Sequence, residues 1–104
     1  MRGWKLEVLH SLSGSGGPVA KLARNPSGAL YGTNFMDGAH GYGSVFSLSP
    51  EGGKWRYRTL HDFTGGKDGG YPGGSVRFDD SGNIYGTAVT GGAHGYGVLY
   101  EIAP

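Results

Sequence analysis

Short runs of alternating apolar and polar residues, separated by glycine-rich segments, make up most of this chain. In the first run, Trp4, Leu6, Val8, His10 and Leu12 fall on one side and mainly polar residues on the other. This period of two is typical of a half-buried β-strand. Further runs predict strands at 20–24, 29–34, 44–49, 55–63, 75–78, 83–89 and 98–102. No segment shows a convincing helical period, so we expect an all-β protein.

Two kinds of connection join these runs. Short turns are predicted at 25–28, 50–53 and 79–82, where Asn, Asp, Pro, Ser and Gly cluster. Longer Gly-rich loops fill 13–18, 36–43, 64–72 and 90–97. Alternate connections of an antiparallel meander lie at the same end of the sheet. We therefore expect the short turns at one end and the long loops at the other.

The chain is a tandem repeat. The hexapeptide Gly-Ala-His-Gly-Tyr-Gly occurs at 38–43 and again at 92–97, 54 positions later. Upstream, 4–12 aligns with 55–63 at a shift of 51, because the second copy has three extra residues in the loop that follows. Internal repeats of this length are typical of arrays of small supersecondary units.

Four antiparallel strands in about 50 residues have the size of one β-propeller blade. We expect a single domain, 1–104, of two four-stranded antiparallel propeller-type blades (repeats 4–54 and 55–104). Two blades cannot close a ring, and repeat arrays usually need at least three units. The strand at 4–12 would be an outermost strand, whereas the one at 98–102 has no outer neighbour. We therefore predict a homo-oligomer in which the N-terminal strand of one chain completes the last blade of another, with a six-bladed trimer favoured over an eight-bladed tetramer.

Composition narrows the possible partners. Nine basic and eight acidic residues give a net charge of +1, so we expect no nucleic-acid partner. The chain has no cysteine and no apolar run of about 18 residues, so we expect neither disulfides nor membrane insertion. Residues 1–16 lack the continuous apolar stretch of a signal peptide.

The long loops are the candidate binding regions, because binding residues concentrate on loops held by a rigid scaffold. His40 with Tyr42, and His94 with Tyr96, lie among glycines that allow a ligand to approach the backbone. A tyrosine ring can pack on a sugar while hydroxyl and imidazole groups form hydrogen bonds. The alternative is that these residues are structural and tie the loops to the blade edges.

Other residues have both a functional and a structural interpretation. Asp68 and Tyr71 lie in the longer second loop and could contact a ligand, or could belong to a solvated turn. Trp55 could stack on a ligand or pack between blades. We expect His10 and His61 to be buried and to donate hydrogen bonds to loop carbonyls.

Patterns for catalysis or metal binding are scarce. The sequence has no nucleophile-elbow motif, no pair of histidines with the spacing of a helical zinc motif, and no closing Glu for a calcium loop at 79–83. We predict no catalytic residues, no metal and no cofactor. A His-Tyr pair acting as base and acid in a polysaccharide-cleaving enzyme is the enzymatic alternative.

The second copy resembles the GloVer-type tandem repeats. The motifs that carry this resemblance are Leu-His-x-Phe at 60–63, Gly-Gly-x-Asp-Gly-x-x-Pro at 65–72, Asp-x-x-Gly-Asn-Ile-Tyr-Gly-Thr at 79–87, Gly-Gly-Ala-x-Gly-x-Gly at 91–97 and the strand at 98–104. The first copy departs from this pattern, because it has no counterpart of Asp68. The resemblance implies a repeat of bacterial exported proteins, and hence an extracellular or cell-surface location. It implies no activity for individual residues.

The leading hypothesis is a non-enzymatic, lectin-like module. An oligomeric β-propeller would bind carbohydrate through its Gly-rich loops, with its own copies and glycans as partners. The alternative is a structural or protein-interaction propeller, a fragment or an engineered repeat protein with no ligand.

Overall fold

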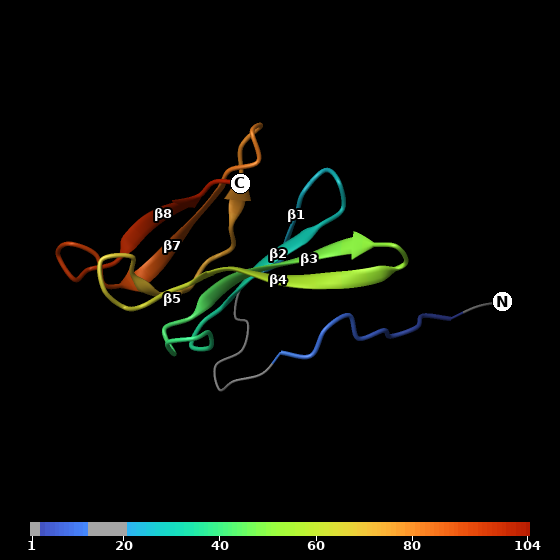
Figure 1. Ribbon diagram of the computed structural model, residues 1–104, viewed down its shortest axis with the longest axis horizontal. Helices are drawn as coiled ribbons and strands as arrows, with labels where there is room; N and C mark the ends of the chain where they lie inside the picture. Colours follow the sequence, from blue (N-terminus) through green and yellow to red (C-terminus); the bar gives the residue numbers. More distant parts are fainter. Residues whose placement is uncertain (1–2, 13–20) are drawn as a thin grey trace.

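The computed structural model describes residues 3–12 and 21–104, and this part of the chain contains eight β-strands and no helix. The strands form two antiparallel sheets (Figure 1). The first sheet has the order β1 (Ala23–Arg24), β2 (Leu30–Asn34), β3 (Ser44–Glu51) and β4 (Lys54–Asp62). The second contains β5 (Gly70–Pro72), β6 (Arg77–Phe78), β7 (Ile84–Thr90) and β8 (Val98–Ile102). The predicted all-β class, with two four-stranded antiparallel sheets, is confirmed. The described residues form no helix that could cross a membrane.

The second sheet has four strands but is only three strands wide. β5 and β6 both pair with β7, one after the other, and β8 pairs with the other edge of β7. By sequence β4 belongs to the second repeat, yet it pairs with β3 of the first repeat. The first sheet is therefore complete, whereas within the described residues no strand lies outside β8.

The strand registers repeat from one sheet to the other. Gly32 lies opposite Phe46 in the β2–β3 pair, and Gly86 lies opposite Tyr100 at the equivalent place in β7–β8. Each glycine leaves room for the ring across from it, because a Cβ atom at either position would overlap that ring. The same close packing of a ring over a glycine is thus built into both sheets.

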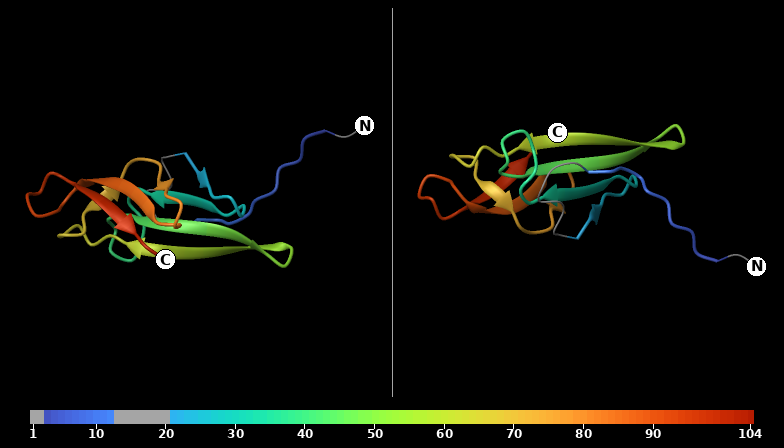
Figure 2. Two further views of the ribbon diagram at one scale, coloured as in Figure 1. Left: turned by 90° about the horizontal axis from the view of Figure 1, so that it is seen from above. Right: turned by 90° about the horizontal axis from the view of Figure 1, so that it is seen from below.

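The hydrophobic core lies between the two sheets, which face each other (Figure 2). Its buried centre consists of Val45 on β3, Phe63 directly after β4, Val76 directly before β6 and Ile84 on β7. Aromatic contacts flank this centre: the ring of Phe63 lies 5.2 Å from that of Tyr100, edge to face. The sheets are therefore packed as neighbouring layers rather than joined edge to edge.

The predicted short turns are present. The backbone N–H of Asn25 donates to the carbonyl of Ala29 at 3.0 Å, and that of Asp79 donates to the carbonyl of Asn83 at 3.1 Å. The turn predicted at 50–53 is shorter, because β3 and β4 continue to Glu51 and from Lys54. Gly52 and Gly53 alone make the turn, with φ values of 59° and 81°, as a two-residue hairpin requires.

The strand predicted at 4–12 is absent. Residues 3–12 form no strand. The ring of His10 stacks on that of Tyr57 in β4 at 3.9 Å, and from there the segment extends away from the sheets towards the N-terminus (Figures 1 and 2). Trp4, Leu6 and Val8 are exposed. A strand needs a hydrogen-bonding partner, and the outer edge of β8 lies on the opposite side of the molecule (Figure 1). Of the strand predicted at 20–24, only Ala23–Arg24 are observed as strand (β1), and Ala20 lies outside the described residues. The loop predicted at 13–18 also lies outside the described residues.

Candidate binding site at the loop end

Three long loops meet at one end of the two sheets, and we call 36–43, 64–72 and 90–97 the loop end. The backbone N–H of Tyr71 donates to the carbonyl of Tyr42 at 2.7 Å, and that of Gly92 donates to the carbonyl of Gly66 at 2.9 Å. These bonds join the middle loop to each of the other two. The prediction that the long loops gather at one end is confirmed for these three segments. The loop predicted at 64–72 is shorter than expected, because Gly70–Pro72 form β5 and pair with β7.

An aromatic cluster joins two of these loops. The ring of Tyr71 lies 5.3 Å from the ring of Phe35 and 5.3 Å from the ring of Tyr42. Tyr71 has a φ of 56° and is the one non-glycine residue with positive φ in the part of the chain that the structure describes. The first repeat has Gly17 at the equivalent place in the sequence. A left-handed conformation costs a side-chain-bearing residue about 1–2 kcal/mol, so a tyrosine at this position needs a compensating role.

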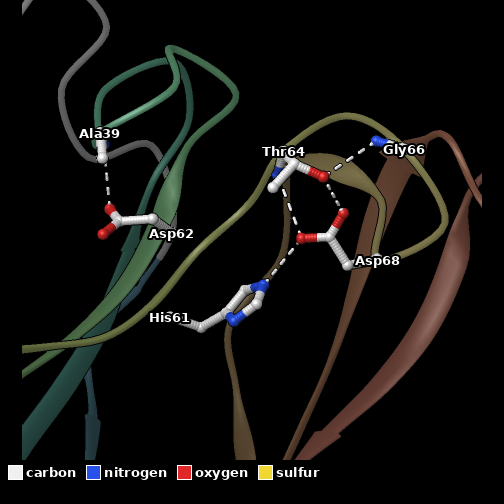
Figure 3. Close-up of polar contacts among 6 residues, drawn as sticks. All are labelled: Ala39, His61, Asp62, Thr64, Gly66 and Asp68. Carbon is white, nitrogen blue, oxygen red and sulfur yellow. Dashed lines mark hydrogen bonds and ion pairs between the residues drawn. The ribbon is translucent and has the colours of Figure 1, made fainter.

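Asp68 is hydrogen-bonded within the middle loop (Figure 3). Its carboxylate lies 2.9 Å from Nε2 of His61 and accepts hydrogen bonds from both the amide and the hydroxyl of Thr64. Partial burial raises the pKa of Asp68, but the hydrogen bonds from Thr64 and His61 outweigh this effect and lower the pKa from 3.8 to about 2. The expectation for His61 was therefore wrong in two respects, because the ring is only half-buried and its partner is a carboxylate rather than a loop carbonyl. The expectation that His10 is buried was also wrong, because His10 is exposed and its ring stacks on that of Tyr57.

A polar hollow of about 510 Å³ lies beside loop 36–43. Its lining includes Asn34, Asp37, Ser44, Tyr57 and Asp62. The amide of buried Asn34 donates to the hydroxyl of Ser44 at 3.2 Å and lies 3.5 Å from the hydroxyl of Tyr57. Asp62 accepts a hydrogen bond of 3.1 Å from the backbone of Ala39, which holds the loop to the end of β4 (Figure 3). Volumes of 300–1,000 Å³ are typical of small-molecule sites.

This hollow was not predicted from the sequence, although the sequence contains a signal for it. Asn34 ends β2 and Ser44 begins β3, and the second repeat has Ala88 and Val98 at the equivalent positions. The first repeat therefore has polar residues at two positions where the second repeat has apolar ones. Buried polar groups are retained where they are hydrogen-bonded, and such a departure from the repeat pattern marks a place to look for a site.

The predicted site residues are only partly brought together. Tyr42 and Tyr71 are in contact, whereas His40 and His94 are exposed on their loops. Tyr96 is also exposed. Trp55 lies opposite Pro50, beside the turn at the tip of the β3–β4 hairpin and therefore away from the loop end.

The short-turn end carries an acidic network. The carboxylate of Asp79 accepts hydrogen bonds from Asn83 and from the hydroxyl of Tyr85, and these bonds lower its pKa to about 2. The same hydroxyl also lies 2.9 Å from Glu101, and its contacts with Asp79 and Glu101 raise the pKa of Tyr85 to about 12. This network fixes the turn at 79–82. Among residues 3–12 and 21–104, no three His, Asp or Glu side chains are grouped so as to hold a metal ion.

Comparisons with known proteins give one result. No curated protein and no solved structure matches the chain. The family model for the Gloeobacter/Verrucomicrobia repeat matches residues 1–104, which confirms the resemblance carried by the motifs of the second copy. The chain therefore belongs to the Gloeobacter/Verrucomicrobia repeat family.

Proposed function

We propose that this chain is a non-enzymatic carbohydrate-binding module. Several copies would form a closed β-propeller and present their loop ends to glycans. The observation that carries the proposal is Tyr71, a strained tyrosine within an aromatic cluster at the end where the long loops meet. Non-glycine residues with positive φ cluster at binding sites, and tyrosine rings pack well on sugars because one end is apolar and the other polar.

The polar hollow supplies complementary chemistry. Hydroxyl groups of a sugar need both donors and acceptors, and the lining of the hollow offers the carboxylate of Asp62, the hydroxyl of Tyr57 and the hydroxyl of Thr59. The hollow and the aromatic cluster lie beside the same loop, 36–43. One glycan reaching across this loop could use both.

Ring closure would multiply the site. Three copies would give six blades, and four copies eight, with three slightly favoured. Each copy would add one loop end to the same face of the ring. Several weak sites on one rigid ring bind a multivalent glycan more tightly than one site alone.

The substitution Tyr71→Gly tests the binding role. Glycine relieves the strain at positive φ and removes the ring. We expect binding to a glycan array to fall at least tenfold while the melting temperature changes little, because relief of strain offsets the lost ring contacts. Tyr71→Phe keeps the ring and should retain most of the binding.

Two results would count against the proposal. The first is an array of bacterial and plant polysaccharides that shows no binding at high protein concentration. The second is Tyr71→Gly binding as tightly as the parent but melting at a clearly lower temperature, which would assign Tyr71 a structural role. Native mass spectrometry tests the ring separately: three or four copies support closure, and a monomer contradicts it.

A further inference from the structure

The outer edge of β8 has the features of a strand-binding groove. Within the described residues, β8 pairs with β7 alone. A hollow of about 260 Å³ is lined by all five residues of β8 together with His61, Phe63, Lys67 and Asp68. An unpaired strand edge presents backbone donors and acceptors to any strand that can reach it. The edge of β8 thus has hydrogen-bonding capacity for one more strand, and the hollow beside it has room for side chains of that strand.

Residues 4–12 have the sequence of the strand that belongs there. They align with 55–63, which includes most of β4, the outer strand of the first sheet. Yet they form no strand, and Leu6 and Val8 expose their side chains. In Figure 1 this segment and β8 lie on opposite sides of the molecule. The groove and the segment are therefore complementary but separated within one copy.

We propose that residues 4–12 of a second copy bind β8 as the fourth strand of its sheet, in the register of the β3–β4 pair. This inference rests on the assembly proposed above and specifies how it closes. The register follows from repeat equivalence, because Leu48 lies opposite Tyr57 and Phe46 opposite Thr59. Shifting these pairs by 54 and 51 positions places Leu6 opposite Ile102 and Val8 opposite Tyr100.

The proposed register matches apolar side chains to apolar side chains. Ile102 and Tyr100 are partly buried against the core between the sheets. Leu6 and Val8 would extend that core outwards, in the way that the ring of Tyr57 stacks on Phe46 at 5.4 Å in the first sheet. A shift by one residue would instead place the charged residues of the segment on the core face. The register is therefore specified by the alternating pattern.

One pair in this register is unfavourable. Glu7 would lie opposite Glu101, whereas the first sheet has Arg58 opposite Ser47. Like charges directly opposite each other destabilise a strand pair, and opposite charges stabilise it. Changing the charge of Glu7 should therefore alter the strength of association in this register, which an unspecific contact would not show.

Engineered cysteines test the register directly, because the chain has no cysteine of its own. Lys5 and Ala103 would be opposite each other, and both are exposed, so Lys5→Cys and Ala103→Cys should not disturb folding. Mixing the two single variants under mild oxidation should give mainly a disulfide-linked heterodimer. As a control, Glu7→Cys mixed with Ala103→Cys places the cysteines two residues out of register and should link at least tenfold more slowly, although Glu7 is also exposed. Equal linking in both mixtures, or none in the first, overturns the proposal.

The charge pair offers a second, independent measurement. Glu7→Arg should tighten self-association about tenfold at low salt, because repulsion from Glu101 is replaced by attraction. Glu7→Gln should give a smaller gain, and high salt should reduce both. Weaker association of Glu7→Arg contradicts the register. Neither experiment involves a glycan, so both outcomes are independent of the proposed carbohydrate binding. If the chain forms a ring but Lys5→Cys and Ala103→Cys do not link, only the proposed strand pairing is refuted.

Discussion

Equivalent positions of the two repeats are buried in one sheet and exposed in the other. Val45 on β3 is 0% exposed, whereas Leu99, 54 positions later on β8, is 80% exposed. The reverse holds on the other face, where Val76 is 3% exposed and its counterpart Leu22 is 55% exposed. The difference therefore does not come from residue type, because all four side chains are aliphatic.

The cause is the neighbouring sheet. Val45 and Val76 belong to the core between the sheets, whereas Leu22 and Leu99 lie outside that core. The loop tyrosines follow the same rule: Tyr42 packs on Tyr71 of the next unit and is 37% exposed, while Tyr96 is 91% exposed. In a repeat array each unit contacts only its neighbours, so burial depends on the place of a residue in the array.

Placing a charge at the two equivalent positions should give the largest contrast. Val45→Asp buries a carboxylate in the core and should destabilise the fold by more than about 3 kcal/mol, enough to unfold a small domain. Leu99→Asp should change the unfolding free energy of the dissociated chain by less than about 0.5 kcal/mol, because the side chain is exposed. Urea denaturation followed by circular dichroism at low protein concentration measures both.

In the assembled state, by contrast, Leu99→Asp should have a large effect. If another sheet covers Leu99 in a ring, then Leu99→Asp should abolish association while leaving the dissociated chain folded. Native mass spectrometry of the variant reads this directly. A variant that unfolds at low concentration, or that still assembles as tightly as the parent, would break the equivalence between the two repeats.

A feature shared by both sheets gives the next largest effect. Gly86→Ala would drive a methyl group into the ring of Tyr100, and overpacking of this kind costs about 1–3 kcal/mol. Gly32→Ala should cost a similar amount, because it meets the ring of Phe46. Gly66→Ala is the matched control, since its Cβ would make one ordinary contact with Thr64, at 3.5 Å. Equal stability of all three variants would refute the ring-over-glycine arrangement.

The strands were largely predictable because the alternating pattern and the turn residues agree. β8 was predicted at its observed bounds, and the hairpins at 25–28 and 79–82 were found where Asn25 and Asp79 begin them. The segment 4–12 carries the same pattern as β4, yet forms no strand. Alternation specifies which face a strand would bury, but it does not supply the partner edge.

The site was less predictable because its contacts are made across loops. Tyr42 and Tyr71 were selected individually, but their contact depends on how the two loops turn. The pairing of His61 with Asp68 also depends on a loop, in which Asp68 folds back over Thr64. The sequence can therefore identify candidate site residues, whereas the fold of the loops determines which of them are in contact.

We expect substitution of Asp68 to have the smallest effect on stability. Asp68 lies in the loop that is longer in the second repeat than in the first. Its pKa is about 2 in the folded chain against an ordinary value of 3.8. A carboxyl group with a lowered folded-state pKa stabilises the fold fully above the unfolded-state value, and this contribution is lost as the pH falls through the folded-state value. Stability should therefore decline between about pH 4 and pH 2, and Asp68→Asn should reduce that decline.

At neutral pH we expect Asp68→Asn to cost about 1 kcal/mol or less, because the contact with His61 is partly exposed to solvent. Asp80→Asn is the matched control, since it removes the same formal charge from the exposed turn at the opposite end. Thermal unfolding from pH 2 to pH 7 compares the two variants. If both flatten the profile equally, the pH dependence comes from net charge. If only Asp68→Asn does so, the longer loop of the second repeat is held by its carboxylate, which the first repeat lacks.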